Sequence, residues 1–283
     1  MKKIILSADS TCDLDDLLIE RYDVNIQPLH INLGNKHHRD GVDITPDIIY
    51  NTYEEHRILP KTSAPNIVEY MEHFKKWTDE GYEVIHLSLG SGLSSSYQNS
   101  CMAAKELGNV YTIDSGNLSA GIGLLVIEAA ERIAKGIRAA QICQEVNELK
   151  SKVHTSFVVD NLTYLYDGGR CSALAALGAN LLNIKPCIEV DNSSGKMNVG
   201  KKYRGTIQKV LKNYTMDKLG NCTDLKTDRI FIAYSGPSTE NIGHIKRTVE
   251  EMYDFKEILI TRAGCTISSH CGSNTHGVMF MSK

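Results

Sequence analysis

The sequence predicts an α/β protein of two packed domains, the first a doubly wound parallel sheet and the second a mixed α+β sheet with helices. In the first half, three short apolar segments (Lys3–Leu6, Val84–Leu89 and Val110–Ile113) are each followed by a helical pattern. This alternation favours βαβ units and a parallel sheet. After about residue 153 the pattern changes to hairpins mixed with helices. A chain of 283 residues is long enough for two hydrophobic cores.

In the first domain, helices are expected after each strand: an acidic one after Asp9-Ser10-Thr11, one near 95–107 and one near 118–135. Between the first two strands, residues 27–35 predict a turn with flanking strands. The segment PKTSAPN is expected to open a further helix that ends near Glu80, because Pro65 fits a first helical turn.

In the second domain, a Gly-Gly turn at 167–170 precedes an expected small-residue helix over 172–182. Segments 184–190 and 197–203 flank the turn DNSSGK and predict a hairpin. A helix from Thr206, a strand at 230–234, a helix at 239–253 and strands at 257–261 and 277–281 complete the pattern. We expect domains at 1–158 and 159–283, packed together, because residues 155–165 lack a linker composition.

Composition narrows the classes of function. The net charge of −3 shows no excess of basic residues, so nucleic acid is not an expected partner. The longest near-apolar stretch, 118–130, is interrupted by polar residues and is too short to span a membrane, so membrane contact is expected to be transient at most. The start of the chain is too short for a signal-peptide core.

Eight cysteines are scattered without a C-x-x-C pair, which favours reduced thiols and a cytoplasmic location. Cys265, Cys271, His270 and His276 lie close in sequence, but no second close ligand pair accompanies them. No metal and no cofactor are therefore predicted.

The segment SLGSGLSSSYQNS at 88–100 has more hydroxyls than one helix cap requires. It contains neither a G-x-S-x-G nucleophile elbow, nor G-x-G-x-x-G, nor a Walker A loop. Hydroxyls also follow the other two strands, at Ser10-Thr11 and Ser115. Since the carboxyl ends of parallel strands share one edge of a sheet, these groups are predicted to form a small anion site there. No Lys or Arg lies in the cluster, so a carboxylate fits at least as well as a phosphate.

Seven motifs in order resemble the DegV family, which includes the fatty-acid-binding subunits of bacterial fatty acid kinase. They are Asp9-Ser10-Thr11, Thr62-Ser63-x-Pro65, Gly92-Leu93-Ser94 with Tyr97-Gln98, Asp114-Ser115, Gly168-Gly169-Arg170-x-Ser172, Ile184-Lys185-Pro186 and His270-x-Gly272. The resemblance covers essentially the whole chain. It implies two domains with a long-chain fatty acid between them, and a separate ATP-dependent kinase subunit that phosphorylates the bound acid in phospholipid metabolism. The chain itself is then a non-catalytic carrier.

Carried over by position, the resemblance implies that Thr62 and Ser94 bind the carboxylate, with Ser63 and Ser115 adjacent and His270 in the same polar network. It also places Arg170 and Arg204 at the mouth of the head-group site or on the kinase-docking surface. The chain departs from the family at Gly272-Ser273-Asn274, where Gly-Pro-Gly is common, and at Ala64 and Asn66, where Gln and Ser are common. The departure at Gly272-Ser273-Asn274 concerns the shape of the loop beside His270.

Simpler interpretations stay open for these residues. Thr62 or Ser63 alone fits a helix cap, Ser115 a turn, Arg170 a solvated side chain and His270 an ordinary interior histidine. The segments GIGLLVIEAA and ALAALGANLL fit core helices as well as tunnel walls. Two other functions also remain: a serine hydrolase that uses Ser94 with His270 as base, and a small-metabolite sensor. The sequence leaves acyl chain length, saturation and oligomeric state open.

Overall fold

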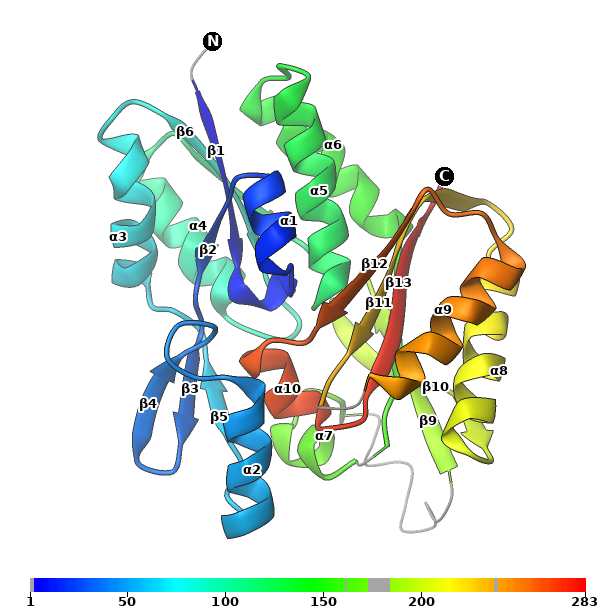
Figure 1. Ribbon diagram of the computed structural model, residues 1–283. Helices are drawn as coiled ribbons and strands as arrows, with labels where there is room; N and C mark the ends of the chain where they lie inside the picture. The colour runs from blue at the N-terminus through cyan, green and yellow to red at the C-terminus, as the bar shows by residue number, and fades with distance from the viewer. Residues whose placement is uncertain (1–2, 161, 173–183, 237–238) are drawn as a thin grey trace.

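A computed structural model describes residues 3–160, 162–172, 184–236 and 239–283, and it forms two layered α/β units (Figure 1). The strands and helices of the first unit are β1 (Ile4–Asp9), α1 (Asp16–Arg21), β2 (Val24–Gln27), β3 (His30–Leu33), β4 (Lys36–Arg39), α2 (Pro46–His56), β5 (Lys61–Ser63), α3 (Ile67–Thr78), β6 (Glu83–Ser88), α4 (Ser96–Leu107), β7 (Val110–Asp114), α5 (Ala120–Ala134) and α6 (Ala139–Leu149). Short 3-10 turns at Ser10–Cys12 and Lys150–Lys152 follow β1 and α6.

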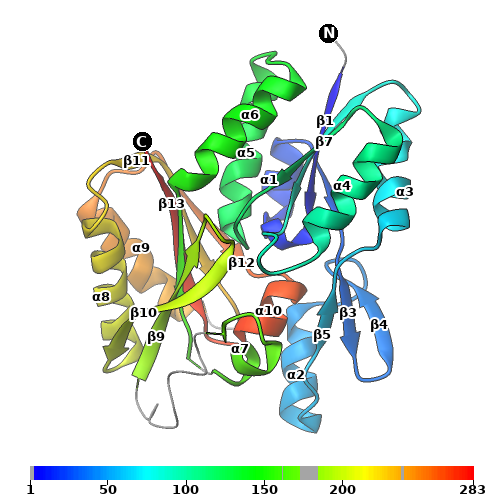
Figure 2. The same ribbon diagram turned by 180° about the vertical axis from the view of Figure 1, so that it is seen from behind.

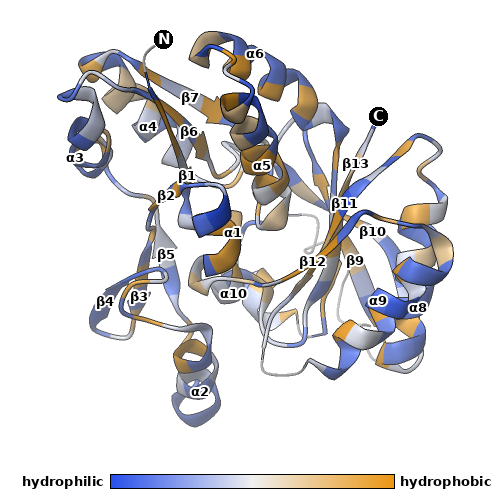
Figure 3. Ribbon diagram, turned by 45° about the horizontal axis from the view of Figure 1, so that its top comes forward, coloured by the Kyte–Doolittle hydropathy of each residue, from blue (hydrophilic) through white to orange (hydrophobic). Residues whose placement is uncertain are grey.

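The first sheet has the order β2-β1-β6-β7, and all its strands are parallel. Helices α3 and α4 cover one face, and α5 and α6 cover the other (Figures 1 and 2). The doubly wound first domain is therefore confirmed. Helix α5 is buried through residues 120–130 and lies between the two sheets, and much of its ribbon has the hydrophobic colour in Figure 3. The segment GIGLLVIEAA is thus a core helix, and it lines none of the site described below.

A separate antiparallel sheet, β4-β3-β5, was only partly predicted. Thr62 pairs with Ile31 in this sheet, so Thr62 and Ser63 lie in a strand and cap no helix. Helix α3 begins at Ile67 instead, behind a capping box of Asn66 and Glu69. The helix expected to open at PKTSAPN is thus present, and Asn66 at the end of that segment caps it. Pro65 lies before the cap rather than in the first helical turn, and the residue that precedes it is biased toward extended backbone.

The second unit contains β8 (Val153–Val158), α7 (Thr163–Gly168), β9 (Ile184–Asp191), β10 (Lys196–Arg204), α8 (Ile207–Gly220), β11 (Leu225–Tyr234), α9 (Glu240–Met252), β12 (Glu257–Arg262), α10 (Cys265–Cys271) and β13 (His276–Ser282). Its sheet has the strand order β10-β9-β8-β13-β11-β12 and contains both parallel and antiparallel pairs, in agreement with the predicted α+β class. Strand β8 pairs with β9 and β13, so a division after residue 158 separates it from its own sheet. The expected helix at 172–182 lies almost wholly outside the described residues.

Between the two units, a network of charged side chains forms around Glu128 of α5. Its carboxylate accepts hydrogen bonds from Lys226 of β11 and from Arg132, both at 2.7 Å, and Arg229 lies 3.7 Å away. Burial acts to raise the pKa of Glu128, but these hydrogen bonds bring it below its ordinary value. The ionised carboxylate therefore ties the first domain to the second sheet.

We expect Glu128→Ala to lower the free energy of unfolding by about 1–3 kcal/mol, because it removes the hydrogen bonds that a buried carboxylate accepts from two partly buried cations. Equilibrium unfolding in urea measures this loss. Glu250→Ala, which removes an exposed ion pair with Lys246, is the matched control and should cost less than about 0.5 kcal/mol. Equal effects of the two variants would contradict the role of Glu128.

Candidate functional site

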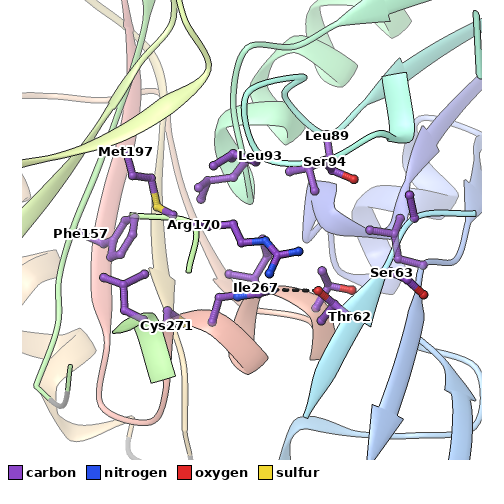
Figure 4. A pocket seen from close by; sticks show the side chains of 16 residues that line it. Thr62, Ser63, Leu89, Leu93, Ser94, Phe157, Arg170, Met197, Ile267 and Cys271 are labelled. Carbon is purple, nitrogen blue, oxygen red and sulfur yellow. Dashed lines mark hydrogen bonds between the residues drawn. The ribbon is translucent and has the colours of Figure 1, made fainter. Parts of the chain in front are cut away.

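A pocket of about 580 Å³, including its opening to solvent, lies where the two units meet (Figure 4). Residues of both units line it: Leu29, Thr62, Ser63, Ala64, Leu89, Leu93, Ser94, Leu118, Phe157, Leu165, Arg170, Met197, Thr266, Ile267, His270 and Cys271. Most of these side chains are apolar. The polar side chains come from β5, from the turn between β6 and α4, from the end of α7 and from α10. The pocket is therefore apolar with a small polar group in its wall.

Thr62 and His270 form the centre of this polar group. The Thr62 Oγ1 and His270 Nε2 atoms lie 2.8 Å apart, although the residues are separated by 208 positions in the chain. Strand β5 positions the threonine (Figure 4), and α10 positions the histidine. Gly168 lies against the imidazole, where a Cβ would collide with Nδ1, so close packing explains this glycine of the Gly-Gly-Arg motif.

The imidazole of His270 is neutral at physiological pH. Burial, together with the positive charge of Arg170, lowers the pKa of His270 to about 4. Its Nδ1 is buried and has no hydrogen-bond partner among the described residues. A neutral ring beside a threonine hydroxyl makes a hydrogen-bonding site rather than a charged one.

Ser94 lines the pocket from the turn between β6 and α4. Its Oγ accepts a hydrogen bond from the Ser96 amide at 3.1 Å and lies 2.9 Å from the Ser96 hydroxyl. Ser91 instead donates to Asp114 at the end of β7, at 2.6 Å. The surplus serines therefore bond mainly to one another and to the neighbouring turn, and Ser94 faces the pocket.

The structure separates the other predicted site residues. Ser63 lines the pocket but is exposed, and Ser115 follows β7 at the expected sheet edge. The Ser115 hydroxyl is buried and bonds to the Asn117 backbone, so it shapes the turn rather than lining the pocket. Arg170 is exposed at the pocket, and Figure 4 shows its guanidinium group extending across it. Arg204 is exposed at the end of β10, outside the lining.

Thr266 is a lining residue that the sequence analysis missed. It lies four residues before His270, so the two share a face of α10. Its Oγ1 is buried without a hydrogen-bond partner in the described part of the chain. The available signal was the short run of hydroxyls before His270, but no periodicity marked this segment as a helix.

A second apolar pocket continues from the first and shares four lining residues with it: Leu118, Phe157, Ile267 and Cys271. It extends to Ala233, Gly277 and Met279 of the second sheet. The two pockets therefore adjoin across shared apolar residues, and the Thr62–His270 pair lies in the wall of the first.

A sequence profile described as "Uncharacterised protein, DegV family" matches residues 3–283. The chain belongs to the DegV family. One curated relative, a DegV domain-containing protein of Clostridium perfringens, is 36% identical over 208 residues, or 73% of this chain and 74% of the relative. Another from the same organism is 32% identical and spans 99% of this chain and 98% of its own. The family suggested by the seven motifs is thus confirmed.

Solved structures share the fold over the whole chain. A DegV family protein from Thermus thermophilus, described as fatty acid binding, has a TM-score of 0.90 at 27% identity and full coverage of both chains. A fatty acid binding DegV family protein from Streptococcus agalactiae has a TM-score of 0.88 at 26% identity, also with full coverage. A stearic acid-binding protein from Eubacterium ventriosum has a TM-score of 0.84 at 25% identity, covering 100% of this chain and 99% of its own.

The geometry disfavours the serine hydrolase alternative. His270 bonds to Thr62 rather than to Ser94, and its other ring nitrogen has no orienting carboxylate among the described residues. The low pKa of the ring also makes it a weak general base at neutral pH.

Two further kinds of feature are absent from the described residues. No helix there is long and apolar enough to cross a membrane. No group of three or more His, Cys, Asp or Glu side chains is arranged to hold a metal ion.

The low pKa of His270 predicts a loss of stability in acid. An unfolded histidine binds a proton below about pH 6.5, whereas folded His270 binds one only below about pH 4. Between these values the unfolded state holds more protons, so the free energy of unfolding falls as the pH falls. Burial lowers the pKa of His73 to about 3, which acts in the same direction, whereas burial raises the pKa of Asp13 to about 8 and acts in the opposite direction.

Urea unfolding at a series of pH values from 4 to 7.5 tests this. As the pH falls from 6.5 to 4, the unfolding free energy of His270→Gln should rise relative to that of the wild type, because the variant lacks this histidine's contribution. His56→Gln, which changes an exposed histidine, should leave the dependence unchanged. A His270→Gln profile with the wild-type slope would show that the histidine titrates normally.

Proposed function

We propose that this protein binds a long-chain fatty acid in the junction pocket and presents its carboxylate to a separate ATP-dependent kinase subunit. The observation that carries the proposal is the apolar lining with a neutral hydroxyl–imidazole pair in its wall. The Thermus and Streptococcus relatives, which have the same fold over their full length, are described as fatty acid binding.

The apolar lining accounts for the affinity. Burial of about 14 methylenes at ~0.8 kcal/mol each contributes on the order of 11 kcal/mol before the costs of association. Leu93, Leu118, Phe157 and Met197 supply apolar surface from both units. In this arrangement the tail gives most of the binding energy, and the head group fixes the orientation.

The polar residues account for the orientation. A buried carboxylate is costly unless hydrogen-bonded, and Thr62, Ser94 and His270 provide neutral groups in the wall of the pocket. Thr266 adds an unpaired hydroxyl on the same helix face as His270. Ser63 belongs to the rim, and Ser115 supports the site by holding its turn.

The kinase step rests on the family resemblance and on the position of Arg170. Its charged side chain lies exposed at the pocket, where a partner that approaches the carboxylate would meet it. We assign Arg170 and Arg204 to contact with the kinase or with the phosphoryl group being transferred. The carrier itself carries out no chemistry in this scheme. A small-metabolite sensor is the remaining alternative, but the extent of the apolar lining favours a long acyl chain.

Thr62→Ala and Ser94→Ala should each weaken palmitate binding by about 1–3 kcal/mol, because each removes a hydrogen bond to a buried charge. Titration calorimetry or displacement of a fluorescent fatty acid measures the change. Ser95→Ala is the matched control, since Ser95 is exposed and makes no side-chain cap hydrogen bond. Wild-type affinity in both pocket variants would show that the carboxylate lies elsewhere.

The carrier role predicts that the chain alone forms no acyl phosphate from ATP, Mg²⁺ and palmitate. Addition of a fatty acid kinase catalytic subunit should start the reaction, which hydroxylamine trapping of the product detects. Arg170→Ala and Arg204→Ala should slow partner-dependent turnover while palmitate affinity changes less than twofold. Turnover without a partner would contradict the carrier role, and unchanged turnover in Arg204→Ala would remove Arg204 from the mechanism.

A further inference from the structure

Helix α10 is held at its start by two carboxylates from the first domain. The Gly264 amide donates to Asp13 Oδ1 at 2.9 Å, and the Cys265 and Thr266 amides donate to the two oxygens of Asp40 at 2.8 and 3.2 Å. Both carboxyl groups are almost fully buried, with Asp13 5% and Asp40 3% exposed, and burial raises the pKa of Asp13 to about 8. Three consecutive amides of a helix start are thus satisfied by side chains more than 200 residues away.

The carboxylates are themselves fixed by hydroxyls of the first domain. Ser119 donates to Asp13 Oδ2 at 2.5 Å, and Ser10 donates to Asp40 Oδ2 at 2.9 Å. Ser10 also accepts a hydrogen bond from the amide of Leu29, a pocket residue. Asp13, Asp40 and the two serines therefore form one connected group, which we call the α10 clamp.

Helix α10 carries a quarter of the pocket lining on one short element. Thr266, Ile267, His270 and Cys271 all belong to it. The helix has only seven residues, too few to be stable by itself in water. Its position must come from tertiary contacts, and the clamp provides the polar ones at its start.

We infer that Asp13 and Asp40 are positioning residues for the head-group site: they set the position of α10 and so place His270 against Thr62. This inference rests on the proposed function, since it concerns the residues that bind the carboxylate. The clamp joins α10 of the second unit to the same domain that carries Thr62 and Ser94. Displacement of the helix start would shift His270 from Thr62 without removing any pocket side chain.

Asp40→Asn is the sharpest test because it keeps the shape of the side chain. Both Asp40 oxygens accept from backbone amides, so either orientation of the asparagine places its NH₂ group against an N–H donor. We expect palmitate affinity to fall about tenfold. Affinity for 1-hexadecanol, which has the same tail without a carboxylate, should change less than twofold. Equal losses for both ligands would indicate general damage to the pocket and overturn the inference.

A double-mutant cycle gives a second readout that needs no alcohol binding. If Asp40 acts through the Thr62–His270 pair, Asp40→Asn should cost palmitate affinity less than threefold in a Thr62→Ala background. Additive losses would overturn the inference. Ser10→Ala, which removes only one hydrogen bond to Asp40, should give a smaller loss of the same kind, and it replaces Asp40→Asn if that variant does not fold.

Asp43→Asn is the matched control, because Asp43 is exposed in the same loop and its carboxylate contacts, among the described residues, only the nearby Arg39 amide and His38. It should leave palmitate affinity within twofold of the wild type. The test also separates the two proposals. If wild-type protein binds no palmitate, the proposed function fails. If it binds palmitate and Thr62→Ala weakens binding while Asp40→Asn does not, only the role of the clamp fails.

Discussion

The site depends on contacts that fix the position of one sheet relative to the other. At one place, the carboxylate of Glu128 on α5 accepts hydrogen bonds from Lys226 of β11 and from Arg132. At another, Asp13 and Asp40 bind the start of α10. The pocket lies where these units meet, and neither unit encloses it alone. Buried carboxylates with full sets of donors are well suited to this task, because their geometry is specific and their loss is costly.

The chemistry of the pocket follows from how little charge faces it. Burial keeps His270 neutral, and Thr62, Ser94 and Thr266 contribute only hydroxyls. Among the described lining residues, Arg170 alone is charged, and it is exposed. A neutral donor set binds a carboxylate without a buried ion pair, whose desolvation cost often exceeds its Coulombic gain. It also leaves the carboxylate oxygens free of a tightly bound cation, which suits a group that is to react.

The sequence predicted the parallel first sheet because each buried strand and its following hydroxyls are local patterns. It also predicted that Thr62, Ser94 and His270 belong to the site, through the family motifs, and these three do line one pocket. It did not predict β5, because a three-residue strand exists only through its pairing with β3. Ser115 was placed at the correct sheet edge, but its side-chain direction depends on a turn closed by Asn117.

Helix α10 shows most clearly what a single sequence cannot reveal. The segment CTISSHC has β-branched residues and serines, no amphipathic repeat and a glycine on each side, at Gly264 and Gly272. Its helical form depends on the side chains of Asp13 and Asp40, which accept hydrogen bonds from its first backbone amides. Both residues lie beside hydroxyl groups in loops that are far from α10 in the sequence. Such long-range polar contacts leave no periodic signal, so Thr266 was missed.

The division of the pocket between the two units has a further consequence for stability. The tail would contact Leu93 and Leu118 of the first unit together with Phe157 and Met197 of the second. The head group would lie between Thr62 of one unit and His270 of the other. A ligand that contacts both units at both ends stabilises their packed arrangement over any separated one, by an amount that grows with ligand concentration relative to its Kd. In the proposed function, the ligand thus adds to the contacts of Glu128 and the α10 clamp, and the protein would be most stable when it is loaded.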